Sequence, residues 1–141
     1  MRGRKVYLLL VLIALLPRAF FLAEAVRVPL FDYLYLDAAS YDGWAERLAE
    51  GEWVGERAFH MAPLYPYLLG VLYRIAGRDL LAVRVAQHLL GICNLLLVFA
   101  IARRIFGRRT AWAAFFLALG YGPLLYFEGQ VLASTLGVTR T

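Results

Sequence analysis

The stretch that decides the fold is LDAASYDGWAERLAEG, residues 36–51, followed after a short gap by MAPLYPY, residues 61–67. This acid-rich and aromatic-rich segment lies between two long apolar blocks. Seven of the ten acids of the chain fall between Val26 and Ala62, namely Asp32, Asp37, Asp42, Glu46, Glu50, Glu52 and Glu56. A lone charge in hydrocarbon costs about 2.5–3.5 kcal/mol on insertion scales. The sequence therefore predicts a polar loop that is tied to a membrane at both ends.

The composition predicts an integral membrane protein. Of the 141 residues, 62% are hydrophobic and only 18% are charged, so the surplus of apolar side chains is expected to face lipid. The net charge of +5 does not indicate nucleic acid, because seven of the fifteen bases gather in two clusters at the ends of the apolar blocks: Arg2, Arg4, Lys5, Arg103, Arg104, Arg108 and Arg109. That clustering predicts a multi-pass plasma-membrane protein with a cytoplasmic N-terminus and with residues 26–62 outside.

The apolar runs predict an all-α protein with about three membrane-spanning helices. These are residues 6–26, 80–105 and 110–127, the last broken or kinked at the Gly120–Pro123 turn. The first run also resembles a secretory signal, with Ala23-Glu24-Ala25 as a cleavage site, but its length of about 20 residues favours a retained helix.

The external loop, residues 27–78, is predicted to hold two shorter helices. Residues 38–50 carry Tyr41, Trp44, Ala45 and Leu48 at helical spacing, so we expect an amphipathic helix on the membrane surface, ended by Gly51. Residues 63–76 are too few to span. If they did cross, RRIFGRR would emerge outside against the positive-inside rule, so a re-entrant or interfacial helix is predicted.

One face of the 80–105 helix is polar. It carries Arg84, Gln87, His88, Gly91 and Asn94, and it must face protein or a wet cavity. His88 has no ligand-type residue three or four positions away, so we predict a hydrogen-bonded packing residue, with no metal and no other cofactor.

Two further residues of the apolar runs have simple structural expectations. Arg18 is expected to snorkel toward the far interface, because it lies late in the first span. Cys93 is expected to be a small core residue.

The order of these elements resembles the N-terminal part of C-type membrane glycosyltransferases of family 39. That group uses polyprenyl-phosphate sugars and includes protein O-mannosyltransferases and lipid A aminoarabinose transferases. The similar residues are Arg18, Asp37-x-x-x-Tyr41, Trp44-Ala45, Gly51, Ala62-Pro63-Leu64-Tyr65-Pro66-Tyr67, Val83-Arg84, Ala102-Arg103-Arg104-x-Phe106-Gly107-Arg108-Arg109 and Phe127-Glu128-Gly129.

The resemblance implies a fragment of a larger fold. Residues 128–141 would be a truncated tail, and the missing C-terminal helices, membrane lipid and a polyprenyl-phosphate-linked sugar would be the partners. A fragment of this kind is expected to be inactive alone.

The resemblance also implies roles for individual residues. Asp37 matches the acid after the first span that acts on the acceptor as general base, and Glu128 could match a second acid. Some relatives carry a lysine before the proline that matches Pro63, and this chain has Ala62 there.

Contacts to the donor phosphate and to the sugar are therefore predicted for other residues. Arg57 and His60 are the nearest cations to Ala62, and Arg84 suits a phosphate by its guanidinium. Tyr41 and Tyr65 complete the predicted substrate-binding set.

Simpler roles remain open for several of these residues. Asp37 could be only a helix N-cap, Glu128 could mark the end of a span, and Arg84 could be paired with the loop acids or Asp79. Solvated helix-face positions are predicted for Asp42, Glu46 and Glu50. An interfacial aromatic belt is predicted for Tyr65, Tyr67 and Tyr73, with a lipid or sugar platform as the second interpretation.

A second function of a different class fits the polar helix face. Such faces line pathways or pack on partner helices, so the chain could be a non-catalytic membrane protein, either an assembly partner or part of a transporter.

Overall fold

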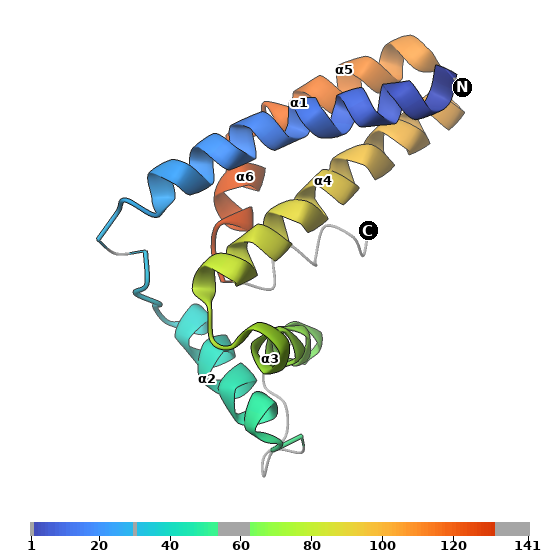
Figure 1. The fold of residues 1–141 in the computed structure, drawn as a ribbon. Helices are drawn as coiled ribbons and strands as arrows, with labels where there is room; N and C mark the ends of the chain where they lie inside the picture. The colour runs from blue at the N-terminus through green and yellow to red at the C-terminus, as the bar shows by residue number, and fades with distance from the viewer. Residues whose placement is uncertain (1, 30, 54–62, 132–141) are drawn as a thin grey trace.

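The computed structural model describes residues 2–29, 31–53 and 63–131, and in these ranges all regular structure is helical. The helices are α1 (Arg2–Ala25), α2 (Asp37–Glu50), α3 (Leu64–Ala76), α4 (Leu80–Ile105), α5 (Arg108–Leu119) and α6 (Gly122–Glu128). The predicted all-α membrane fold is confirmed. Figure 1 shows two layers: α1, α4 and α5 run side by side, while α2 and α3 cross below the start of α4.

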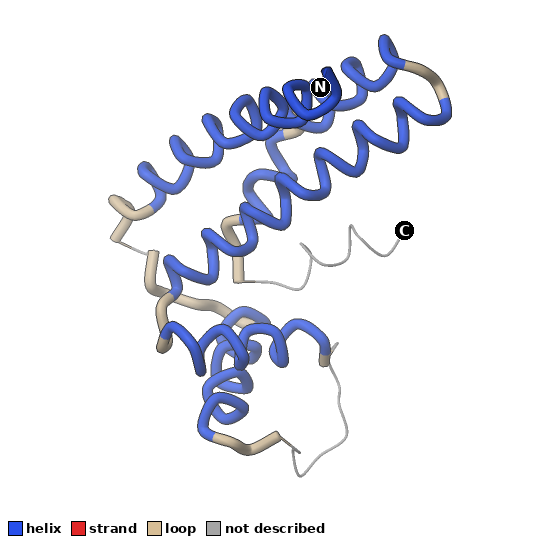
Figure 2. The backbone as a smooth tube through the Cα atoms, turned by 45° about the vertical axis from the view of Figure 1, so that its right-hand side comes forward, coloured by secondary structure: helices blue, strands red, loops and turns tan. Residues whose placement is uncertain are grey.

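Two helices are long and apolar enough to cross a membrane, Arg4–Ala25 and Leu80–Ile105. A third candidate is the pair α5 and α6, bent by 58° at the break before Gly122. Pro123 in the first turn of α6 has no N–H to continue the ladder of α5, which explains the bend where the sequence predicted it. In Figure 2 the two helices follow one another with the break between them.

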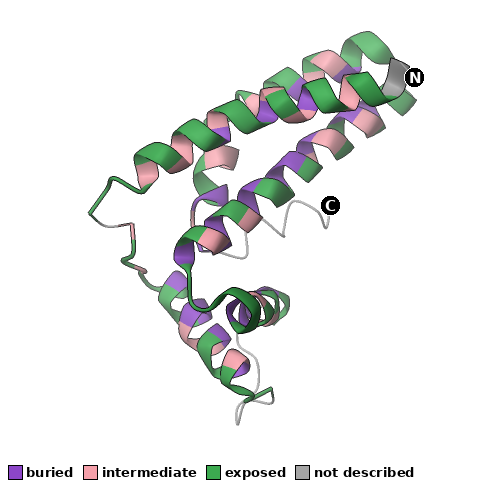
Figure 3. Ribbon diagram, viewed as in Figure 1, coloured by how far each residue is buried: buried purple, intermediate pink, exposed green. Residues whose placement is uncertain are grey.

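The long helices share one apolar core. Leu10 and Ala14 of α1 meet Phe99 of α4 and Phe115 of α5, and all four side chains are fully or almost fully buried. In Figure 3 the buried residues follow the inner faces, and the outward face of α1 is exposed. Cys93 lies on the exposed surface of α4, so the prediction that it is a core residue was wrong.

The shorter helices α2 and α3 pack tightly on each other. A Cβ at Gly70 would lie 2.8 Å from the Cβ of Leu48 and 3.2 Å from the carbonyl oxygen of Ala45, so the missing side chain permits the close crossing. Three residues of the predicted apolar stripe of α2, Tyr41, Ala45 and Leu48, are buried, and Trp44 is half-buried. The partner of this stripe is α3, however, and a membrane surface is not needed to cover it.

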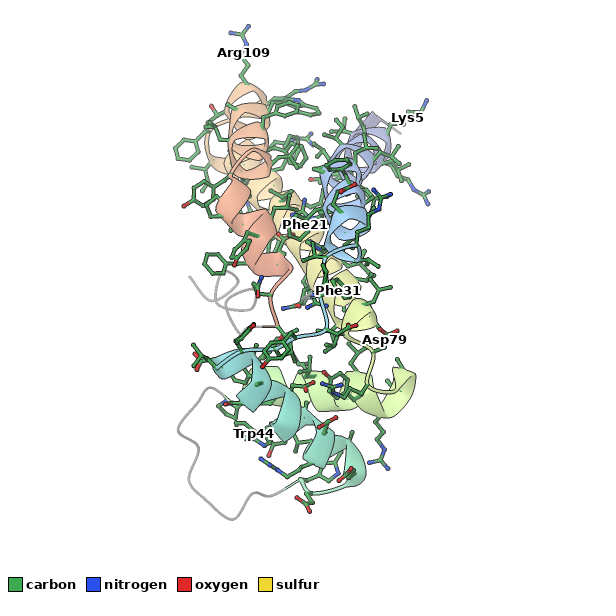
Figure 4. All side chains as sticks on the ribbon, turned by 90° about the vertical axis from the view of Figure 1, so that its left-hand side faces the viewer. Lys5, Phe21, Phe31, Trp44, Asp79 and Arg109 are labelled. Carbon is green, nitrogen blue, oxygen red and sulfur yellow. The ribbon has the colours of Figure 1, made fainter. Side chains whose placement is uncertain are left out.

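The residues at the end of α2 and at the start of α4 explain where these two helices stop and begin. Gly51 closes α2 in the left-handed conformation, with φ 108°, as predicted. Asp79 caps α4 by accepting hydrogen bonds from the backbone N–H groups of Leu81 and Ala82. Figure 4 shows Lys5 and Arg109 at one end of the molecule and Asp79 and Trp44 at the other, so the basic ends of α1 and α5 lie together, away from α2 and α3.

Candidate functional site at the junction of the two layers

The two layers meet where four segments converge: the linker after α1, the start of α2, the first turns of α4 and the end of α6. Ala38, Val83 and Val131 come from three of these segments and share one buried apolar cluster. This cluster brings the neighbours of Asp37 and Arg84 together, although the two residues are far apart in sequence.

Arg84 is the polar centre of the junction. Its Nε donates to the carbonyl oxygen of Gly129 at 3.0 Å, and its Nη2 donates to the carbonyl oxygen of Phe31 at 2.5 Å. The guanidinium carbon lies 3.8 Å from the centre of the Phe31 ring. Nη1 is buried and has no hydrogen-bond partner among the described residues. The alternative, a buried ion pair with a loop acid or Asp79, is absent from the ion pairs of the described residues: backbone carbonyls accept from Arg84, and the loop acid Asp32 interacts with it only electrostatically.

Two tyrosines and Gln87 continue this polar layer. Gln87 donates through Nε2 to the hydroxyl of Tyr65 at 3.2 Å and to the carbonyl oxygen of Gln130 at 2.9 Å. The ring of Tyr41 meets that of Tyr65 edge to face at 5.1 Å. Burial raises the pKa of Tyr65, so its hydroxyl stays protonated. The structure therefore brings Tyr41 and Tyr65 close to Arg84, three of the five residues of the predicted substrate-binding set.

Asp37 lies at the rim of the junction, exposed to solvent. It is the first residue of α2, and the N-cap position belongs to Leu36, so the alternative role of Asp37 as N-cap was wrong. No described residue pairs with its carboxylate. Leu36 has φ 49° and ψ −117°, a sparsely populated backbone conformation that costs a non-glycine residue about 1–3 kcal/mol. An unusual backbone therefore precedes an unpaired carboxylate.

Glu128 occupies a different environment from Asp37, because its carboxylate is buried between two helices. Oε1 accepts from Arg18 Nη2 at 2.7 Å, and Oε2 lies 3.0 Å from His88 Nδ1. Arg18 also donates to the carbonyl oxygen of Ala14, one turn back along α1. The prediction that Arg18 snorkels was therefore wrong, because burial beside Glu128 pairs its charge more favourably than the far interface would.

His88 is hydrogen-bonded, as predicted, but its partner is Glu128 rather than a neighbour on its own helix. Sequence reasoning missed this buried group of three. The available signal was a pair of opposite charges, Arg18 and Glu128, in apolar segments of different helices, since each alone would be costly there.

The sequence did not reveal a second network, which is centred on Asp42. The prediction of a solvated helix-face position was wrong for this residue. Asp42 is 6% exposed and accepts hydrogen bonds from the hydroxyl of Tyr73 and from Nη2 of Arg78 at 2.6 Å. Glu46 and Glu50 are both exposed, as predicted, and Glu46 also pairs with Arg78 at 2.9 Å. The bond to Asp42 is the main cause that raises the pKa of Arg78. This network ties the end of α3 to the middle of α2.

The predicted aromatic belt is wrong for two of its three members. Tyr65 and Tyr73 are buried between α2, α3 and α4, and only Tyr67 is partly exposed, with its hydroxyl bonded to the carbonyl oxygen of Trp53 at 2.6 Å. The predicted donor contacts Arg57 and His60, together with Ala62, lie outside the described residues.

The sequence profile of the family described as dolichyl-phosphate-mannose-protein mannosyltransferase matches residues 60–133, just over half of the chain. The chain belongs to this family. The matched segment runs from the start of α3 to the end of α6, so Tyr65, Arg84, His88 and Glu128 all lie within it, and Asp37 lies before it. Searches of curated proteins and of solved structures found no match.

Membership of the mannosyltransferase family, together with the apolar helices, makes this a membrane protein of the glycosyltransferase class. The junction is then the natural place to look for its substrates. It combines a buried cation with an unused N–H, two tyrosines and an exposed carboxylate at the boundary between the apolar helices and the polar α2–α3 layer.

Proposed function

We propose that this chain supplies part of the active site of a transferase that moves a sugar from a polyprenyl phosphate to an acceptor at the outer face of the membrane. The observation that carries the proposal is Arg84. Its guanidinium is buried and oriented by two carbonyl oxygens, and Nη1 has no hydrogen-bond partner among the described residues. A fixed guanidinium with a free donor is suited to a phosphate oxygen.

Asp37 is the proposed general base. The acceptor oxygen attacks the anomeric carbon of the sugar, the new carbon–oxygen bond forms, and the bond from that carbon to the phosphate oxygen breaks. The acceptor proton passes to the Asp37 carboxylate, which is exposed and unpaired in the described chain. The phosphate leaves with the electron pair, and Arg84 stabilises its charge. The proposal assigns charge stabilisation to this side chain and requires no metal ion.

Tyr41 and Tyr65 are proposed to line the sugar side of the site, because they join Arg84 to the start of α2. Arg57 and His60 are proposed as further contacts to the donor phosphate, on the strength of the family resemblance. Glu128 is proposed to support the reaction without touching the proton in transfer, since both of its oxygens are already engaged by Arg18 and His88.

Family membership favours this function over the non-catalytic membrane protein. On the polar face of α4, which motivated the second hypothesis, Gln87 contacts α3, and Arg84 and His88 contact the end of α6. The remaining walls of the donor site are proposed to come from further membrane helices of the same polypeptide, and residues 1–141 alone are proposed to be inactive. The basic ends of α1 and α5 are proposed to face the cytoplasm.

The test is replacement of Asp37 by Asn in the intact enzyme, assayed with a polyprenyl-phosphate sugar. Loss of a general base lowers kcat by about 10²–10⁴-fold, and the donor KM should change little. Glu50→Gln is the matched control, because Glu50 is an exposed acid on the same helix. Near-normal turnover by Asp37→Asn, or an equal loss in the control, would remove Asp37 from the mechanism.

A further inference from the structure

The end of α6 is locked onto α4 by three consecutive residues. The side chain of Glu128 bonds His88, the carbonyl oxygen of Gly129 accepts from Arg84, and that of Gln130 accepts from Gln87. All three partners lie on the same face of α4. The position of this short segment therefore sets the orientation of the Arg84 guanidinium.

The Glu128 carboxylate fits where Gly91 has no side chain. A Cβ built on Gly91 would lie 2.0 Å from Oε1, 2.2 Å from Cδ and 2.5 Å from Oε2 of Glu128. Real Cβ atoms do not approach so closely, so a side chain at this position would displace the carboxylate, and the cost of that shift is the loss of its contacts with Arg18 and His88. Gly91 is thus required by the carboxylate of another helix, and not by the conformation of its own backbone.

Helix α1 also contacts Glu128 and His88. Arg18 neutralises the carboxylate at 2.7 Å, and the Phe21 ring lies against His88 at 5.6 Å between ring centres. A Cβ on Gly129 would lie 2.5 Å from the Phe21 ring, so Phe21 also presses on the segment that carries the Arg84 contact. Figure 4 shows Phe21 on α1, near the place where α4 and α6 meet.

The position of the Glu128 carboxylate along α4 separates its role from that of the proposed base, Asp37. His88 is one turn further along α4 than Arg84, about 6 Å at 1.5 Å per residue, toward the basic end of the molecule. Asp37 lies at the opposite rim. The Glu128 carboxylate is buried, contacts both Arg18 and His88, and lies away from Asp37. These features suit a group that holds other side chains in place.

We propose that Gly91 and Glu128 are positioning residues for donor binding: the Gly91 slot seats the Glu128 carboxylate between Arg18 and His88, and this fixes the Gly129 carbonyl that orients Arg84. The inference rests on the proposed contact between Arg84 and the donor phosphate. It adds a slot on α4, about two turns from Arg84, where a single added methyl group would control donor affinity.

The experiment is a size-complementation series in the intact enzyme, measured with a polyprenyl-phosphate sugar as donor. Gly91→Ala should lower the melting temperature and raise the donor KM about tenfold, with kcat and the acceptor KM nearly unchanged. Alanine is a better helix former than glycine, so helix propensity cannot cause the loss. Gly43→Ala is the matched control, because a Cβ there meets nothing within 4 Å.

The decisive variant is the double substitution Gly91→Ala with Glu128→Asp. The shorter side chain withdraws the carboxylate by about 1.5 Å, one carbon–carbon bond, and makes room for the added methyl group. We expect the double variant to recover most of the melting temperature and donor KM that Gly91→Ala loses. Glu128→Asp alone should be impaired, because its carboxylate falls short of Arg18 and His88.

The outcomes separate the two proposals. A donor KM that stays normal in Gly91→Ala, or a double variant no better than Gly91→Ala, overturns the positioning role. Arg84→Met tests the underlying function independently. If Arg84→Met leaves the donor KM unchanged, the phosphate contact itself fails, whereas recovery of the melting temperature by the double variant would still establish the slot.

Discussion

Replacing Arg18 by Met should reveal the largest single stabilising interaction at the α1–α6 contact. The ion pair between Arg18 and Glu128 is 2.7 Å long, and the two side chains are only 5% and 8% exposed. Methionine keeps the length of the arginine stem and removes its charge. Glu128 then keeps only His88 as a partner, and a buried carboxylate loses its main neutralising charge.

The expected magnitude follows from this burial. Removing one member of a buried ion pair costs about 3–5 kcal/mol, because the other charge stays behind uncompensated. Arg18→Met and Glu128→Gln should each fall in this range. The double variant leaves neither charge, so its cost should be smaller than the sum of the single costs by about 2 kcal/mol or more.

The measurement is reversible unfolding of the intact protein in mixed micelles, followed by circular dichroism as the fraction of denaturing detergent rises. The four proteins of the cycle give the coupling free energy directly. If the two single costs simply add, within about 0.5 kcal/mol, then Arg18 and Glu128 do not interact in the folded protein and the description of the α1–α6 contact is incorrect.

Three further predictions test other parts of the fold. Single cysteines at Glu52 and at Arg78, in a Cys93→Ser background, should both be labelled from outside intact cells by a membrane-impermeant thiol reagent; labelling of Arg78 only from the cytoplasm would make α3 a spanning helix. Burial and the hydrogen bond to Asp42 raise the pKa of Tyr73 above its ordinary 10.0. The stability that Tyr73 contributes should therefore be complete below about pH 10 and decline as the pH rises further. Tyr73→Phe should reduce that decline, measured as the difference between melting curves taken at about pH 9 and about pH 11. Leu36→Gly should stabilise the protein by about 1 kcal/mol in chemical unfolding, since glycine relieves the positive φ at an exposed position, and a loss of stability there would contradict the strain.

The sequence was sufficient for the helices because their signals are local. The bounds of the 80–105 helix agree with α4 in the structure, and Gly51 and Pro123 mark the ends of elements where their backbone preferences require it. The first helix begins at Arg2, four residues before the apolar run, because basic residues continue a helix into the polar region without adding to the hydropathy signal.

The partners of the polar side chains could not be predicted in the same way. Arg18 and Glu128 are 110 residues apart, and Asp42 is 36 residues from Arg78. Asp42 lies among charged neighbours on α2, so its spacing alone resembles that of a solvated residue. Only the crossing of α2 and α3 shows that Tyr73 and Arg78 cover it. Long-range pairing of this kind leaves no periodicity in the chain.

The contrast between the two buried arginines gives the junction its chemical character. Among the described residues Arg18 has a carboxylate partner in Glu128, whereas the hydrogen bonds of Arg84 go to carbonyl oxygens, and the exposed carboxylate of Asp32 acts on Arg84 through its charge without an ion-pair contact. A carbonyl orients a guanidinium without cancelling its charge, and in surroundings of low dielectric that charge attracts an anion strongly. If the Glu128 carboxylate paired with Arg84, it would neutralise the positive charge of the Arg84 guanidinium. Arg18, His88 and the Gly91 slot hold the carboxylate away from Arg84, which leaves the charge of Arg84 for the donor phosphate that we propose it binds.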